Sequence, residues 1–101
     1  MTDTNSVTIT HEDAPHGGRY VAKVEGEADT GHLDWEPSDD PDIRVATHTI
    51  VPREIGGRGV AAQLVERLIA DARSDGFRIV PQCWYVAKKF DENPDWADLK
   101  A

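Results

Sequence analysis

The sequence has few of the features that mark membrane or secreted proteins. It contains one cysteine, Cys83, among 101 residues, which excludes an internal disulfide and a cysteine-based metal cluster. No apolar run approaches the roughly 20 residues of a membrane-spanning helix, and no apolar segment follows Met1 as in a signal peptide. The composition therefore predicts a protein that is neither embedded in a membrane nor exported, and the expected location is the cytoplasm.

Basic residues are also scarce. Eleven Lys and Arg stand against nineteen Asp and Glu, a net charge of −8. A chain this acidic repels phosphate backbones, so neither nucleic acid nor an anionic membrane is an expected partner. The four histidines show no spacing typical of metal ligands, and no metal site is expected.

The chain shows no internal repeat and no low-complexity linker, and its length fits one domain over residues 1–101, with a short tail of about residues 1–5. Alternation of apolar and polar residues predicts strands over residues 6–11, 19–26, 32–36 and 43–51. Turn-forming residues fill positions 12–18 and 37–42. The first half therefore indicates an antiparallel meander of four strands.

After Gly59 the apolar period changes from two to about 3.6, which predicts one long helix that ends at Gly76. Residues 77–80 read as a fifth strand and residues 85–90 as a short helix, and Asn93 is expected to cap a last helical segment. The fold class is α/β (α+β): a mixed, mostly antiparallel sheet of about five strands. In it, strands four and five are parallel neighbours joined by the long helix.

The segment before the long helix is rich in glycine, Gly-Gly-Arg-Gly-Val-Ala at residues 56–61. Glycines at a strand-to-helix junction let several backbone N–H groups point at one spot, and the helix start adds partial positive charge, which suits a phosphate. Arg53 and Arg58 supply cations nearby. A P-loop is excluded because no Gly-Lys-Ser/Thr follows, and the G-x-G-x-x-A match does not fit the sheet of a dinucleotide-binding fold. The alternative that this segment is only a tight turn and binds no ligand is not excluded by the sequence.

Two prolines and two reactive side chains lie near the ends of the predicted parallel strands. Pro52 and Pro81 offer no N–H to a ladder, so the strands are expected to splay at their carboxyl ends, unless the prolines merely stop them. His48 precedes Pro52, and Cys83 follows Pro81. We expect both side chains near the mouth of one crevice, where histidine could act as a base and the thiol could be activated. A core histidine and an inert buried thiol are the alternative.

These motifs resemble a small one-domain branch of the GNAT N-acetyltransferase superfamily. The resemblance lies in "THTIVP" at residues 47–52, "GGRGVAAQLV" at 56–65, "IVPQCWYV" at 79–86 and "NPDW" at 93–96, and it covers roughly residues 19 to 99. The superfamily's R/Q-x-x-G-x-G/A motif maps onto residues 56–61, with glycine at the first position in place of arginine or glutamine. Helices that cover the acceptor site in larger members have no room in residues 12–18.

The resemblance implies a GNAT-like fold and an acetyl-CoA-dependent N-acetyltransferase that acts on an unknown small-molecule or protein amine. His48 would be the base, and Cys83 either a transient acetyl carrier or a group that contacts the departing thiol. The expected coenzyme-binding residues are Thr49, Ile50, Val51, Arg53, Gly56, Gly57, Arg58, Gly59, Val60, Ala61, Tyr85 and Lys88. The alternatives are a non-catalytic CoA-binding or regulatory module and an interaction domain without a ligand. The protein would be a monomer or a homodimer.

Overall fold

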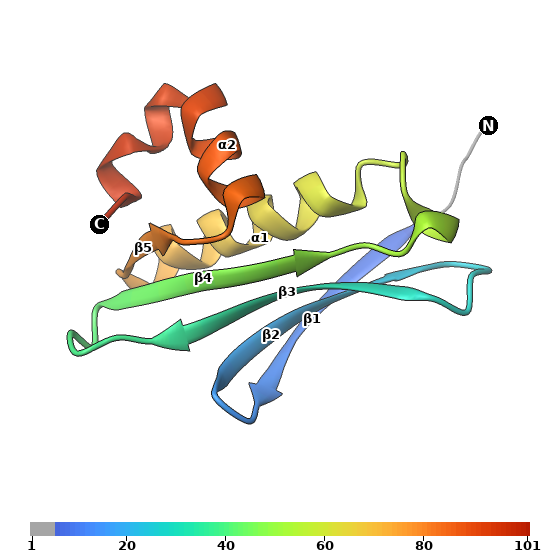
Figure 1. Ribbon diagram of the computed structural model, residues 1–101, viewed down its shortest axis with the longest axis horizontal. Helices are drawn as coiled ribbons and strands as arrows, with labels where there is room; N and C mark the ends of the chain where they lie inside the picture. Colours follow the sequence, from blue (N-terminus) through green and yellow to red (C-terminus); the bar gives the residue numbers. More distant parts are fainter. Residues whose placement is uncertain (1–5) are drawn as a thin grey trace.

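The computed structural model describes residues 6–101, so the predicted tail at residues 1–5 lies outside the described residues. The elements run β1 (Val7–Ala14), β2 (Gly17–Val24), β3 (Thr30–Pro37), β4 (Ile43–Ile50), η1 (Arg53–Ile55), α1 (Val60–Asp75), β5 (Arg78–Pro81), α2 (Trp84–Glu92) and η2 (Pro94–Leu99). The five strands form one sheet in the order β1-β2-β3-β4-β5 (Figure 1). The first four pair antiparallel and β4 pairs parallel with β5, as the sequence predicts.

The core lies between the sheet and α1. Alternate residues of β2 and β3, among them Tyr20, Ala22 and Leu33, are fully buried on the face that α1 covers. The helix contributes the predicted apolar stripe, buried at Val60, Leu64, Val65, Leu68, Ile69 and Ala72. We call this side of the sheet the core face. The outer face is the opposite side, to which the intervening residues Arg19, Val21, His32 and Asp34 point.

The boundaries of α1 follow from glycine at each end. Gly59 precedes the helix with φ 74°, and Gly76 ends it with φ 81°, donating its N–H to Ala72 O. Both values lie in the left-handed region, which residues with a side chain enter at a cost. The predicted helix therefore starts and stops where the sequence indicates.

Three details differ from the sequence prediction. Residues 12–14 and 17–18 continue β1 and β2, since Ala14 pairs with Gly17, and the turn shrinks to Pro15 and His16. A 3-10 turn not expected from the sequence, η1, follows β4. Asn93 does not cap η2 with its side chain but donates from Nδ2 to Lys89 O at 2.8 Å, which satisfies a carbonyl at the end of α2.

No helix in residues 6–101 is long and apolar enough to cross a membrane.

Candidate functional site

The parallel pairing of β4 and β5 is short. It runs from Ile43 opposite Arg78 to Ala46 opposite Pro81, and Cys83 then donates its N–H to Ala46 O at 2.9 Å. The remaining half of β4, through Ile50, pairs with β3 alone. Pairing ends there, and the two strands part at their carboxyl ends as the sequence predicts. The missing N–H of Pro81 is not the cause, because Arg78 and Cys83 donate to the β4 side and Pro81 lies at an intervening position that faces away from it. Backbone groups along the carboxyl half of β4 are therefore left for another partner.

The glycine loop lies just beyond that half of β4. Gly57 and Gly59 have φ of 77° and 74°, and an added Cβ at either would meet nothing within 4 Å. No side chain caps α1, whose first backbone bond is Gln63 N–H to Gly59 O. Within residues 6–101, no hydrogen bond is donated by the backbone N–H groups of residues 57–61. A helix start with unused amides and open space is suited to a phosphate.

Of the two arginines near this loop, one is already paired. Arg58 donates from Nη2 to Glu27 Oε2 at 3.1 Å, and both side chains are about one-third exposed, 38% and 30%. Glu27 lies in the turn between β2 and β3, and the sequence gives no sign that it meets Arg58. Arg53, in η1, is exposed and has no ion pair among the described residues. The loop therefore has one free cation and one that a phosphate would share with a carboxylate.

A β-bulge in β4 decides where His48 points. Trp35 pairs with Ala46 but Asp34 pairs with His48, so Thr47 is an extra residue in the ladder. Regular alternation would place Ala46 and His48 on the same face. With the bulge, Ala46 is buried in the core while His48 is exposed beside Asp34 on the outer face. His48 thus lies on the opposite side of the sheet from the core.

Cys83 lies on the core side. It is 7% exposed, and its Sγ donates to Thr49 Oγ1 at 3.5 Å. Thr49 follows His48 directly and pairs with the buried Leu33, so its side chain points to the core face. The structure therefore brings Cys83 to Thr49 at the point where β4 and β5 part. It does not bring Cys83 and His48 into one crevice, because the bulge turns His48 away.

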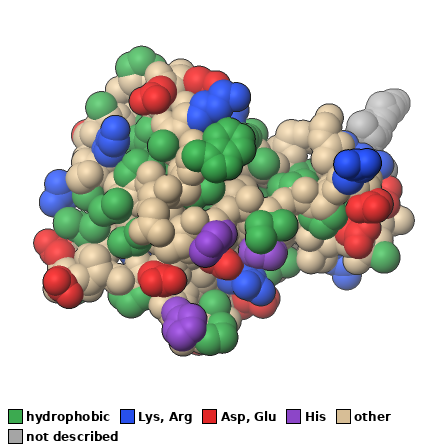
Figure 2. All heavy atoms as spheres, in the orientation of Figure 1, with side chains coloured by type: hydrophobic (Ala, Val, Ile, Leu, Met, Phe, Trp, Pro, Cys, Tyr) green, Lys and Arg blue, Asp and Glu red, His purple; other side chains and the backbone are tan. Residues whose placement is uncertain are grey.

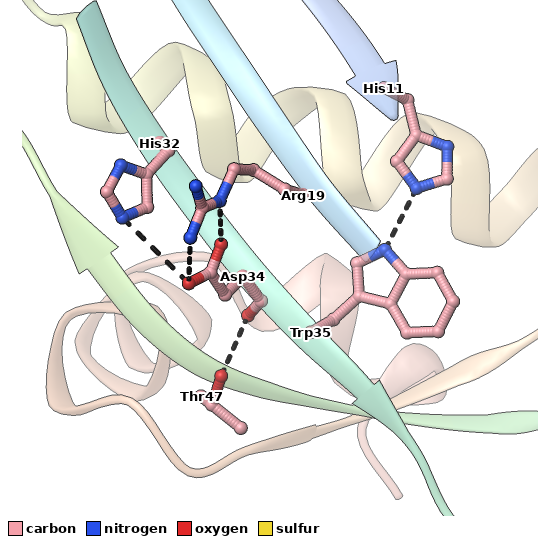
Figure 3. Close-up of polar contacts among 6 residues, drawn as sticks. All are labelled: His11, Arg19, His32, Asp34, Trp35 and Thr47. Atoms are coloured by element: carbon pink, nitrogen blue, oxygen red, sulfur yellow. Dashed lines mark hydrogen bonds and ion pairs between the residues drawn. The ribbon is translucent and has the colours of Figure 1, made fainter. Parts of the chain in front are cut away.

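The surroundings of His48 were missed in the sequence analysis. Arg19 binds Asp34 through two hydrogen bonds, from Nε to Oδ1 at 2.7 Å and from Nη2 to Oδ2 at 3.2 Å (Figure 3). This carboxylate raises the pKa of the Arg19 guanidinium further above its usual value, first through the hydrogen bond and then through its charge. His32 Nε2 lies 3.9 Å from Asp34 Oδ2. The sequence contained a signal for this cluster, since Arg19, His32 and Asp34 occupy outward-facing positions on two neighbouring strands.

Histidine, acidic and basic side chains lie side by side over the middle of the sheet in Figure 2, in the view that Figure 1 shares. On the core side, His11 is structural: it accepts a hydrogen bond from Trp35 Nε1 at 3.0 Å (Figure 3). Its ring also stacks on that of Tyr20.

Tyr85 and Lys88 lie in α2, which follows Cys83. Tyr85 is half-buried and packs edge-on against Trp84, with Lys89 Nζ 5.5 Å from its ring centroid. Lys88 is exposed, and its Nζ lies 3.9 Å from Glu92. Within residues 6–101, no hydrogen bond or ion pair joins either residue to the glycine loop, so their role in coenzyme binding stays a prediction.

A mixed sheet whose parallel strands part beside a glycine-lined helix start defines a small α+β domain of the GNAT type. A family model described as GCN5-related N-acetyl-transferase matches residues 19–99, most of the chain. The chain therefore belongs to the GCN5-related N-acetyltransferase family, which indicates a function of the acyltransferase type. A search of curated proteins gives no match.

Proposed function

We propose that this protein is an acetyl-CoA-dependent N-acetyltransferase. The observation that carries the proposal is the carboxyl half of β4, which has no strand partner on its β5 side and ends next to the uncapped, glycine-lined start of α1. One element offers backbone groups to an extended chain, and the other offers N–H groups to phosphates. Family membership supports the same ligand and the same reaction class.

The residues present fit the coenzyme. The amides of Gly57, Gly59 and their neighbours through Ala61 would donate to the pyrophosphate, and the backbone of residues 49–51 would hold the pantetheine arm. Arg53 is available to a phosphate, whereas Arg58 must give up or share Glu27. The bound coenzyme supplies an acetyl group activated as a thioester.

We propose that Cys83 serves on the thiol side of the reaction and does not carry the acetyl group. The contact of its Sγ with Thr49 Oγ1 suits a thiol donor, and among the described residues no histidine or lysine is bonded to the sulfur. A thiol needs a neighbouring base or cation to become a nucleophilic thiolate. A protonated thiol can instead donate to a departing sulfur.

We propose His48 as the base that takes a proton from the acceptor amine. It is exposed on the outer face, so an acceptor can reach it without displacing the core. A neutral imidazole accepts a proton at its free ring nitrogen near neutral pH. In this arrangement the coenzyme and the acceptor would meet where β4 and β5 part, with Cys83 on the core face of the sheet and His48 on the outer face.

The alternative is a CoA-binding module without turnover, and the observation that favours it is the separation of His48 from Cys83 by the bulge. Two measurements distinguish the readings. Acetyl-CoA should raise the melting temperature, since a ligand at 100 times its Kd stabilises the native state by about 2.7 kcal/mol. Acetyl transfer to a panel of primary amines should then be lost in His48→Gln and reduced in Cys83→Ala, with the coenzyme-induced shift retained.

No shift with acetyl-CoA would refute both readings. A shift with no turnover on any amine would leave only the binding module. Undiminished transfer in His48→Gln would show that another group is the base.

A further inference from the structure

A small pocket opens on the outer face beside His48. It has a volume of about 250 Å³ and is lined by Ala14, Pro15, His16, Gly17, Arg19, Asp34, Trp35, Glu36, Thr47 and His48. The β1–β2 turn forms one side and the bulge of β4 the other. We call it the outer-face pocket. A pocket of this size suits the end of a chain and not a whole large substrate.

The charges that line the pocket are not balanced. The Arg19 guanidinium forms two hydrogen bonds with the Asp34 carboxylate, so the charges of these two side chains neutralise each other. Glu36 also lines the pocket, and in residues 6–101 no Lys, Arg or His lies within ion-pair distance of it. The pocket therefore presents one unpaired carboxylate, two exposed imidazoles from His16 and His48, and the apolar side chains of Ala14 and Pro15. Of the two histidines, His48 is the one that lies on β4, the strand that parts from β5.

We propose that the outer-face pocket is the acceptor site and that it takes a primary ammonium group at the end of an aliphatic chain. This inference rests on the proposed acetyltransferase function. Glu36 would pair with the ammonium group as it arrives, and Ala14 and Pro15 would contact the methylene carbons. His48 takes one proton from the ammonium nitrogen, which leaves a lone pair on the amine and a positive charge on the imidazole.

The same contacts disfavour free α-amino acids. An acceptor with a carboxylate next to its amine would need a cation beside the ammonium site, and the arginine that lines the pocket is already bonded to Asp34. It would also place its carboxylate near Glu36 and Asp34. A lysine side chain and a free aliphatic diamine both present the favoured chemistry, and the experiment below separates them.

The test is an NMR titration of the ¹⁵N-labelled chain, without coenzyme, with 1-aminopentane, 1,5-diaminopentane, Nα-acetyl-lysine amide, glycine and the uncharged pentan-1-ol. We expect the two pentylamines and the lysine derivative to shift the amide signals of residues 14–19, 34–36 and 47–48. Glycine and pentan-1-ol should shift them little at the same concentration. Tighter binding of the lysine derivative than of the diamine would assign the source to protein lysines, and the reverse order to free polyamines.

Glu36→Gln should weaken amine binding about three- to fivefold, as expected for one exposed ion pair, and the loss should shrink at high salt. Glu66→Gln, which removes a carboxylate from the exposed side of α1, is the matched control and should leave binding unchanged. The acetyl-CoA thermal shift should be the same in both variants.

Amine shifts confined to a second cavity, of about 470 Å³ and lined by Asp40, Asp42 and Asp98 together with Arg73 and Arg78, would overturn the proposal. So would equal binding of glycine, or equal loss in Glu36→Gln and Glu66→Gln. An acetyl-CoA shift without amine binding in the pocket would refute this inference alone. Amine binding in the pocket without an acetyl-CoA shift would refute the proposed function instead.

Discussion

Cys83 and Thr49 meet across the line where two parallel strands stop pairing: the thiol of one donates to the hydroxyl of the other at 3.5 Å. A thiol is a weak donor, so the bond adds little to stability, and its effect is to hold the sulfur in one direction. If that orientation of the sulfur serves the reaction, the Thr49 hydroxyl affects the rate only when the Cys83 thiol is present.

Thr49→Val should therefore lower kcat for acetyl transfer while leaving the coenzyme-induced thermal shift intact, because valine keeps the shape and the backbone of threonine. Its stability should fall by less than about 1 kcal/mol. The double variant Thr49→Val/Cys83→Ala should have the kcat of Cys83→Ala alone, as non-additivity is the mark of coupled residues. Losses in kcat that simply multiply would show that the two side chains act separately.

The glycine loop offers a matched pair of substitutions. Gly59→Ala places a Cβ at φ 74° and should destabilise the fold by about 1 to 2 kcal/mol, or shift the helix start and weaken coenzyme binding. Gly56→Ala is the control, since φ −69° and ψ 162° suit any residue and its Cβ would have ordinary contacts, the nearest at 3.4 Å. Denaturant unfolding of both variants gives the comparison. Equal losses would show that the left-handed conformation at Gly59 is unimportant.

The ion pair between Arg58 and Glu27 competes with a phosphate for one guanidinium. Glu27→Gln should free Arg58 and tighten binding of CoA by a few-fold, with a larger gain at low salt, because the pair is partly exposed. Pantetheine, which lacks the pyrophosphate, should bind both proteins equally. Isothermal titration with the two ligands tests this, and weaker CoA binding in Glu27→Gln would mean that Glu27 orients Arg58 toward the phosphates.

Much of the fold could be read from the sequence because local patterns agree with it. Period-two alternation marks the strands, the stripe from Val60 to Ala72 marks the helix, and Gly59 and Gly76 mark its ends. The end of β4–β5 pairing was placed correctly at Pro81, the last residue of the ladder, although the missing N–H is not its cause. These features depend on one residue or one element at a time.

The candidate site was harder because it depends on pairing between strands. Thr47 is an ordinary strand residue by composition, and only the register of β3 against β4 shows that it bulges and turns His48 to the outer face. The Arg58–Glu27 pair joins residues 31 positions apart, one of them in a turn. Sequence periodicity carries no information about the bulge or about the ion pair. The prediction that His48 and Cys83 share a crevice is wrong because the bulge turns His48 to the outer face.

A buried phenol links the sheet to α1. Tyr20 is 0% exposed, and its hydroxyl donates to Asp71 Oδ2 at 2.8 Å, while Asp71 also accepts from Arg67 Nε at 3.2 Å. Tyr20→Phe removes a hydrogen bond to a charged acceptor and should cost about 2 kcal/mol of unfolding free energy at neutral pH. Tyr85→Phe is the control and should cost much less, since the neighbour of the Tyr85 hydroxyl is Lys89 of the same helix and not a residue of another element.

The same phenol should make stability depend on alkaline pH. Burial, and then the hydrogen bond to Asp71, raise the pKa of Tyr20 well above its ordinary value of 10.0. The folded state therefore keeps the proton while the unfolded chain releases it, so this contribution is complete below pH 10 and is lost as pH rises above it. Urea unfolding of wild type between pH 9 and about pH 11 should show a fall in stability that is shallower in Tyr20→Phe. Identical slopes for the two proteins would mean that Tyr20 titrates alike in the folded and unfolded states.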